Sequence, residues 1–193
     1  IIYYRTMQAI VGPNGAGKTT FMDIITGRTR PSTGRLIYKE SINLLKYDEA
    51  AIVGLGIARK FQRPSVFPDQ SVLENLKLAA FKKKNIINSF FYNQKNLDNE
   101  FLMYVIEQIG LDDFVYQKAG LLSHGQKQWL EIGLLLAQEA ELLMLDEPVA
   151  GMTDEERART SELLKVISKE KTVIVIEHDM DFVESLNCPV TVL

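Results

Sequence analysis

A short stretch near the beginning of the chain combines glycines, a lysine and a threonine at a spacing that suits phosphate oxygens. Its three glycines can adopt backbone angles closed to other residues, so successive N–H groups can point into one concavity and bind anions. Lys18 would neutralise phosphate charge, and the Thr19 hydroxyl would ligate Mg²⁺. An apolar run at 7–11 precedes the stretch and a predicted helix at 18–26 follows it, as a working phosphate loop requires. The sequence therefore predicts a nucleotide site formed by Gly12, Pro13, Asn14, Gly15, Ala16, Gly17, Lys18, Thr19 and Thr20.

Two adjacent carboxylates, Asp146 and Glu147, stand at the end of an apolar run that begins at Leu142. The run is too short for a typical helix and a proline follows it, which predicts a buried strand. At the carboxyl edge of a sheet an Asp can hold Mg²⁺ through its water shell, and a neighbouring Glu can orient or deprotonate an attacking water. His178 ends the next predicted strand, 172–177, and we expect it at the same edge.

Two further polar positions accompany these residues. Gln62 ends a predicted strand at 57–62, and Ser123, Gly125 and Gln126 open a predicted helix at 126–137. Ser123 and Gln126 have the spacing of a capping box, and Gly125 would let the helix start approach a ligand closely. Many helices begin in this way, so this pattern is weak when it is taken alone.

The elements that must position these residues alternate between strands and helices. Predicted strands at 142–146, 172–177 and from Val190 are separated by predicted helices at 154–169 and 179–186. This order is typical of an α/β fold with a parallel sheet covered by helices.

The middle of the chain has a different pattern. Ser71 and Glu74 predict a capping box before an amphipathic helix, and another helix is expected at 98–109. We therefore expect one domain over residues 1–193, with a core of 1–70 and 140–193 and a helical subdomain at 71–139.

Length and composition restrict the class of protein. The 193 residues carry a net charge of −3, which argues against a nucleic-acid-binding protein that relies on a basic face. A single cysteine, Cys188, rules out an internal disulfide framework. The sequence contains no run of 18 or more apolar residues and no visible secretory or transit segment. It begins with Ile1 and ends within a predicted strand, so we expect it to be part of a longer chain.

In this order, the motifs closely resemble those of the ATP-binding cassette family of transport ATPases. Residues 12–19 match the Walker A loop, Gln62 the Q-loop, 122–126 the signature motif and 142–146 Walker B. The wording "LSHGQKQWLEIG" and "LDEPVAGMTDEE" looks most like the ATPase subunit of urea importers, which belong with the branched-chain amino acid and amide uptake systems. The resemblance implies the P-loop NTPase (RecA-like) fold, with an inserted helical subdomain and a partial antiparallel β region.

The resemblance also implies the chemistry. ATP and Mg²⁺ are the expected ligands; Thr19, Gln62 and Asp146 would hold the metal, and Glu147, His178, Lys18 and Gln62 would be catalytic. Ser123, Gly125 and Gln126 would act on ATP held by a facing subunit. Expected partners are a second nucleotide-binding subunit, transmembrane permease subunits and, indirectly, a solute-binding protein, at the cytoplasmic face of the membrane. No nucleic acid is expected.

The sequence departs from the family pattern at several positions. His124 replaces the usual third glycine of the signature, and Thr153 stands where an aspartate usually closes the D-loop. Tyr3 and Tyr4 are poorly placed for the aromatic residue that stacks on adenine, so neither receives that role.

Two other functions stay open. One is a soluble cassette ATPase without a transport role, such as an iron–sulfur assembly subunit. Cassettes of DNA repair need long coiled-coil insertions and translation factors need two cassettes, and this sequence has neither. The other is a binding-only module, against which the intact Lys18, Asp146, Glu147 and His178 argue. The transported solute is not encoded in a cassette.

Overall fold

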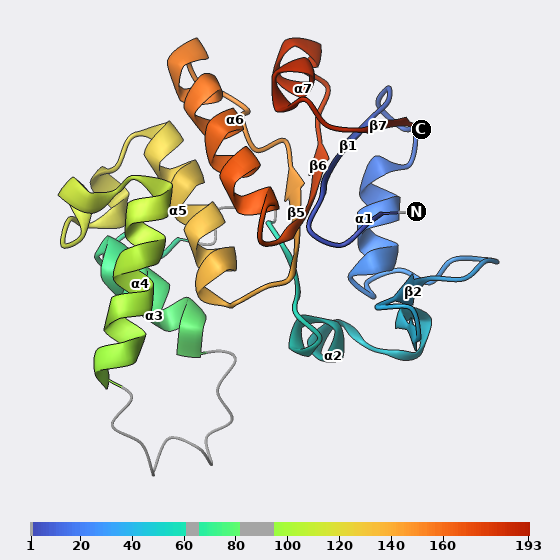
Figure 1. Cartoon of the computed structure of the whole chain (residues 1–193), viewed down its shortest axis with the longest axis horizontal. Helices are drawn as coiled ribbons and strands as arrows, with labels where there is room; N and C mark the ends of the chain where they lie inside the picture. The colour runs from blue at the N-terminus through green and yellow to red at the C-terminus, as the bar shows by residue number, and fades with distance from the viewer. Residues whose placement is uncertain (1, 61–65, 82–94) are drawn as a thin grey trace.

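The computed structural model describes residues 2–60, 66–81 and 95–193. Their centre is a five-stranded parallel sheet in the order β4-β5-β6-β1-β7. Parallel neighbours require crossover connections, and helices supply them on both faces of the sheet (Figure 1). The bounds of the strands are β1 Met7–Val11, β4 Ile57–Arg59, β5 Leu142–Asp146, β6 Thr172–Ile176 and β7 Val190–Val192.

Both faces of the central strands are buried, because alternate side chains enter two different hydrophobic clusters. Leu143, Leu145 and Val173 belong to the larger cluster, whereas Met144 and Ile174 belong to the other. Continuous apolar runs are what a strand covered on both faces needs.

Helices α1 (Lys18–Ile25) and α2 (Glu49–Gly54) cover one face. Helices α5 (His124–Ala137) and α6 (Asp154–Ser168) cover the other, and α7 (Met180–Leu186) contributes Phe182 to the same cluster. The phosphate-loop helix α1 and the helix α5 therefore lie against opposite faces of the sheet, as Figure 1 shows.

The middle of the chain is helical. Helices α3 (Val72–Phe81) and α4 (Lys95–Ile109) pack against each other and against α5. Two short 3-10 turns, η3 (Asp112–Phe114) and η4 (Ala119–Leu121), lie between α4 and α5 in the chain. Their buried residues join the larger cluster, so one apolar core runs from these helices into the sheet.

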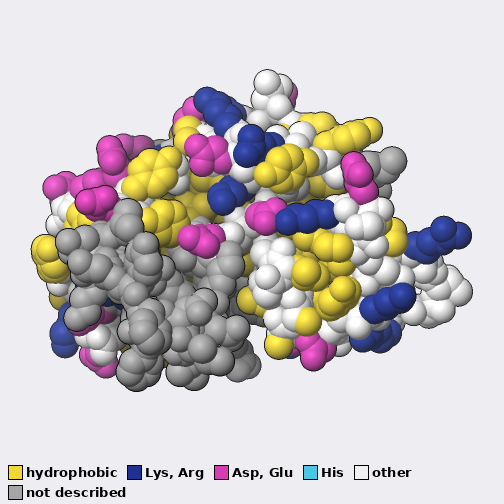
Figure 2. All heavy atoms as spheres, turned by 60° about the horizontal axis from the view of Figure 1, so that its bottom comes forward, with side chains coloured by type: hydrophobic (Ala, Val, Ile, Leu, Met, Phe, Trp, Pro, Cys, Tyr) yellow, Lys and Arg dark blue, Asp and Glu magenta, His cyan; other side chains and the backbone are white. Residues whose placement is uncertain are grey.

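A small antiparallel pair, β2 (Ile37–Tyr38) and β3 (Ile42–Asn43), followed by the 3-10 turn η1 (Leu44–Lys46), flanks the sheet. The predicted fold class, including this antiparallel region, is confirmed. The face in Figure 2 carries acidic, basic and apolar side chains together. Among the described residues, no helix has both the length and the apolar character needed to cross a membrane.

Candidate functional site

The predicted phosphate loop connects the end of β1 to the start of α1. Gly15 and Gly17 have φ angles of 86° and 97°, which glycine adopts without the strain that a side chain brings. Gly17 directly precedes the first turn of α1, and that turn contains no acidic residue. The N-terminus of α1 therefore presents its N–H groups and its positive dipole end to an incoming anion.

Lys18 lies folded back over this loop. Its Nζ donates to the carbonyl oxygens of Gly12 and Pro13, at 2.7 and 3.0 Å. The Lys18 ammonium therefore lies beside the loop that would bind the phosphates. Phosphate oxygens of a bound nucleotide would replace the two carbonyls as its partners. Thr19 and Thr20 are exposed on the first turn of α1, where their hydroxyls are accessible.

Asp146 and Glu147, at the end of β5, differ in burial and in backbone conformation. Asp146 is the last residue of the strand and is only 5% exposed. Glu147 has a φ of 48°, a left-handed conformation that is costly for a residue with a side chain, and its N–H donates to the Ile176 carbonyl at 2.9 Å. This turn brings its Oε1 to 3.4 Å from Nδ1 of His178. The structure thus brings together the carboxylate and the histidine that the sequence predicted at one edge.

Arg59, at the end of β4, is a buried residue that sequence reasoning missed. Its guanidinium contacts Oδ2 of Asp146 at 3.3 Å and also pairs with Asp23 of α1. It therefore ties the strand-end carboxylate to the phosphate-loop helix. An arginine inside a predicted buried strand was the available signal, because such a charge needs a carboxylate partner.

Glu177 is the second residue that sequence reasoning passed over. Its carboxyl group is 2% exposed and receives the backbone N–H groups of His178, Asp179 and, at 3.5 Å, Val149. Burial raises the pKa of Glu177, and these N–H donors oppose that shift. The group joins the loop after β5 to the loop after β6, which holds Glu147 and His178 near each other.

The start of α5 has the predicted capping box. Ser123 Oγ accepts the N–H of Gln126, and the Gln126 side chain accepts the N–H of Ser123 at 2.8 Å. Gly125 lies against α6, since a Cβ at this position would collide with the Glu156 carboxylate. Glu156 in turn completes a capping box with Thr153 at the start of α6.

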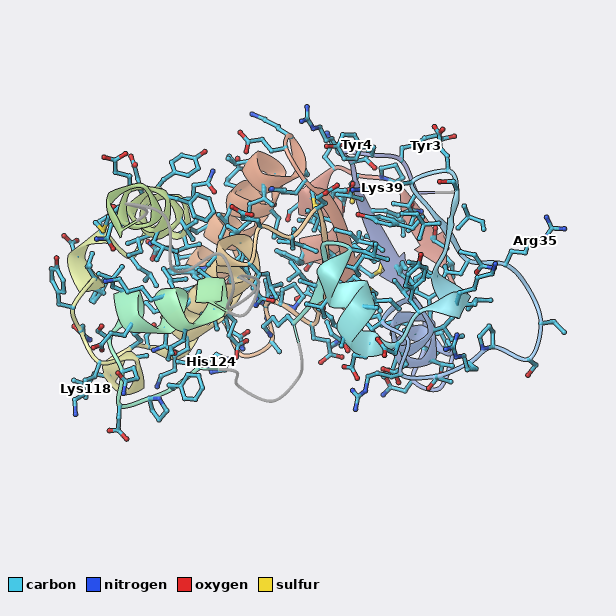
Figure 3. All side chains as sticks on the ribbon, turned by 90° about the horizontal axis from the view of Figure 1, so that it is seen from below. Tyr3, Tyr4, Arg35, Lys39, Lys118 and His124 are labelled. Carbon is cyan, nitrogen blue, oxygen red and sulfur yellow. The ribbon has the colours of Figure 1, made fainter. Side chains whose placement is uncertain are left out.

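Tyr3 and Tyr4 lie at the opposite edge of the sheet from the phosphate loop. The N–H of Arg5 donates to Thr172 at the first residue of β6, and Lys39 pairs with Glu141 just before β5. Tyr4 lies close enough to Lys39 for the two groups to interact electrostatically, and Figure 3 labels both residues. The two tyrosines belong to the amino ends of the strands, away from the carboxyl edge, where ligands bind in such sheets. The predicted metal and catalytic residue Gln62 lies outside the described residues.

The residues present fit a magnesium nucleotide. Within the described ranges, no three His, Cys, Asp or Glu side chains converge on a possible metal site. Protein sites usually hold Mg²⁺ with one or two carboxylates together with substrate phosphates and water. Asp146 keeps Oδ1 outside its pair with Arg59, and Thr19 offers a hydroxyl at the start of α1.

A model of the ABC transporter family matches residues 2–150. The chain belongs to the ABC transporter family. The high-affinity branched-chain amino acid transport ATP-binding protein BraF of Pseudomonas aeruginosa is 32% identical over 198 residues, covering 98% of this chain and 77% of that protein. LivG of Escherichia coli is 30% identical, covering 96% of this chain and 76% of LivG. The phosphonates import ATP-binding protein PhnC of Fusobacterium nucleatum is 29% identical, covering 93% and 74%.

Solved ABC structures have the same fold. The ADP conformation of an ATP-binding cassette of an ABC transporter superposes with a TM-score of 0.83 at 30% identity, covering 100% of this chain and 78% of that one. CbiO1 of Clostridium perfringens, part of the ABC transporter complex CbiONQ, has a TM-score of 0.84 at 28% identity, covering 99% and 74%. As a member of this family, the chain is an ATP-hydrolysing ABC transporter subunit.

Proposed function

We propose that this ABC ATPase drives the uptake of a small solute, and that two copies of a nucleotide-binding subunit enclose each ATP. One observation carries the proposal. The phosphate loop follows β1, Asp146 ends β5 and Glu147 follows it, and His178 follows β6. These three strands are neighbours in one parallel sheet. Their carboxyl ends meet at one edge, which is where ligands bind in such sheets.

The backbone N–H groups of residues 12–17 and the Lys18 ammonium hold the phosphates in this proposal. Thr19, Asp146 and Gln62 hold Mg²⁺, which neutralises charge on the outer phosphates. Arg59 keeps the Asp146 carboxylate fixed beside α1, since it pairs with both Asp146 and Asp23. Positioning and electrostatics of this kind are what phosphoryl transfer chiefly requires.

Glu147 orients the attacking water, and His178 stabilises charge on the outermost phosphate. The contact between Glu147 Oε1 and His178 Nδ1 supports this division, because it holds both side chains at the strand ends. Glu147 is partly exposed, so water can reach it.

Ser123, Gly125 and Gln126 act on the ATP of the facing copy. Within one chain, α1 and α5 pack against opposite faces of the sheet, which supports different nucleotides for the phosphate loop and for the start of α5. The N-terminus of this 14-residue helix suits an anion. We further propose that residues 71–139 act as a subdomain of one nucleotide-binding domain over 1–193.

A complementation experiment tests the shared site. Lys18→Ala removes the phosphate ligand and Ser123→Arg blocks the start of α5, so each variant alone is expected to be inactive. Mixed in equal amounts, they should recover about a quarter of the wild-type rate, because half of random dimers are mixed and each holds one intact site of two. A mixture that shows only the sum of the two separate rates would mean that one chain holds the complete site.

The membrane partners follow from the relatives. BraF and LivG carry the names of branched-chain amino acid transport proteins, and this favours transport over the assembly role. We propose that permease subunits hold the chain at the cytoplasmic face of the membrane and dock on residues 62–68 and on the helices that follow Ser71. Phe67, exposed beside α3, offers them an apolar contact.

We propose branched-chain amino acids, or urea and short amides, as the solute. Uptake of labelled leucine and labelled urea by the assembled complex decides between them, with Glu147→Gln as the inactive control. Uptake of neither solute above that control would contradict both choices.

A further inference from the structure

His124 connects the start of α5 with the loop after β5, two different parts of the site. It is the first residue of α5, and its Nε2 lies 2.8 Å from the carbonyl oxygen of Ala150, in the loop after β5. A carbonyl oxygen only accepts, so Nε2 carries the hydrogen and donates it. The Gln128 amide lies 3.4 Å from the same nitrogen, one turn further along α5. His124 is labelled in Figure 3.

The loop backbone is shaped for this contact. Gly151 has a φ of 73°, and a Cβ on it would lie 3.2 Å from Nε2 of His124. A larger residue would therefore be strained in its backbone and would crowd the imidazole ring. A glycine at position 124 would leave the Ala150 carbonyl without this donor.

The segment 147–153 is a compact turn that joins this contact to Glu147. The N–H of Ala150 donates to the carbonyl of Glu147 at 3.3 Å, and the N–H of Met152 donates to Val149 at 3.1 Å. Val149 is also bonded to the buried Glu177. A displacement of Ala150 is therefore expected to reach Glu147 through the hydrogen bond from the Ala150 N–H to the Glu147 carbonyl.

We propose that His124 is a positioning residue that couples the two ATP sites of the dimer. This inference rests on the proposed function, in which the start of α5 contacts the ATP of the facing chain. When that ATP draws on Ser123 and Gln126, His124 moves with them and shifts the turn that carries Glu147 of its own chain. Closure over one ATP thereby adjusts the catalytic carboxylate that serves the other.

Hydrogen exchange of the nucleotide-free protein tests the contact itself. His124→Ala should speed exchange of the amides in 148–153 by about two- to tenfold, which corresponds to the loss of one ordinary hydrogen bond. His124→Gln should restore the wild-type rate, because its amide can donate at similar reach. Lys127→Ala is the matched control: Lys127 lies on the same turn but bonds the Gly120 carbonyl, so exchange in 148–153 should stay unchanged.

The ATP dependence of hydrolysis tests the coupling. Wild type and His124→Gln should show a Hill coefficient above one, and His124→Ala should fall to about one, the value for independent sites. Unchanged exchange in His124→Ala overturns the contact, and a wild type without cooperativity, or unchanged cooperativity in His124→Ala, overturns the coupling. Complementation between Lys18→Ala and Ser123→Arg leaves His124 unchanged, so its failure would count against the proposed shared site, whereas the exchange and cooperativity of the His124 variants test the contact and the coupling.

Discussion

The carboxyl edge of the sheet and the start of α5 both hold candidate ATP ligands, but they are fixed by different means. At the sheet edge, backbone conformation fixes the candidate ligands. Gly15, Gly17 and Glu147 adopt left-handed φ angles beside hydrogen-bonded strands. At the start of α5, a local capping box fixes the backbone of the first turn, and side-chain contacts attach the helix to neighbouring elements. Those contacts are Lys60 with Glu131, Trp129 with Thr160, and His124 with Ala150.

This difference indicates which part can move. Parallel strands share many backbone hydrogen bonds, so the ends of β5 and β6, with Asp146, are held as one unit. The helix α5 depends on a few individual side chains and on apolar packing, which permits small rotations more easily. The comparison makes the strand ends the rigid part, and the start of α5 with the turn 147–153 that it contacts the adjustable part.

The largest effect is expected at the carboxyl edge of the sheet. Glu147→Gln should lower kcat about 10²- to 10⁴-fold, because a neutral amide cannot take a proton from the attacking water. ATP affinity should stay near the wild-type value, since Glu147 is not a phosphate ligand in this account. Phosphate release and nucleotide titration measure the two quantities. Glu170→Gln, at an exposed position, is the control, and wild-type turnover in Glu147→Gln would remove Glu147 from its role.

The next effect concerns the attachment of α5 to the core. Lys60 and Glu131 form a buried ion pair at 3.2 Å, with side chains 6% and 8% exposed. Lys60→Met should lower the free energy of unfolding by about 1–3 kcal/mol, because it removes a buried, charge-assisted contact of Glu131. The double variant with Glu131→Leu should recover most of the loss. Urea denaturation measures both. A single variant as stable as the wild type would show that this pair does not fix α5.

A smaller effect is expected where α5 meets α6. Gly125→Ala should cost about 0.5–2 kcal/mol, the usual value of a helix cap, because its Cβ pushes the Glu156 carboxylate out of the capping box with Thr153. Gly54→Ala is the matched control, since a Cβ at Gly54, at the end of α2, meets no atom within 4 Å. Equal stability of both variants in thermal unfolding would contradict the close contact.

The smallest effect is a pH dependence. Burial raises the pKa of Glu177 above its ordinary value of 4.5, so the folded state binds this proton more readily than the unfolded state. The resulting stability is present at low pH and is lost as the pH rises through the raised pKa. Glu177→Gln does not titrate, so its stability relative to the wild type should increase over that range. Thermal unfolding measured from pH 4.5 upward tests this, and a flat or falling difference would contradict it.

Local signals in the sequence account for most of the fold. The strand 142–146 has the predicted bounds, and the capping boxes at Ser71 and Ser123 are present. Helix α5 begins at His124 rather than at the predicted Gln126, because the residue after an N-cap is already helical. The predicted strand 57–62 is described as far as β4, Ile57–Arg59, and its last residues lie outside the described ranges.

The parts that the sequence could not reveal are contacts between distant residues. Arg59 meets a carboxylate 87 positions away, and His124 meets a carbonyl 26 positions away. Periodicity and capping rules describe neighbours in the sequence, so they cannot say which buried charge or loop faces another. The carboxyl edge of the sheet was predictable from these local rules, because each of its residues ends a strand or closely follows one.

The molar mass of the Glu147→Gln variant tests the central claim most directly. By light scattering, the protein should give a mass near its own 21.9 kDa without nucleotide and about twice that value when it is saturated with ATP and Mg²⁺. Replacing ATP with ADP should return the smaller mass. A variant that remains a single chain while holding ATP, together with a wild type that hydrolyses ATP steadily as a single chain, would contradict a site completed by a second copy.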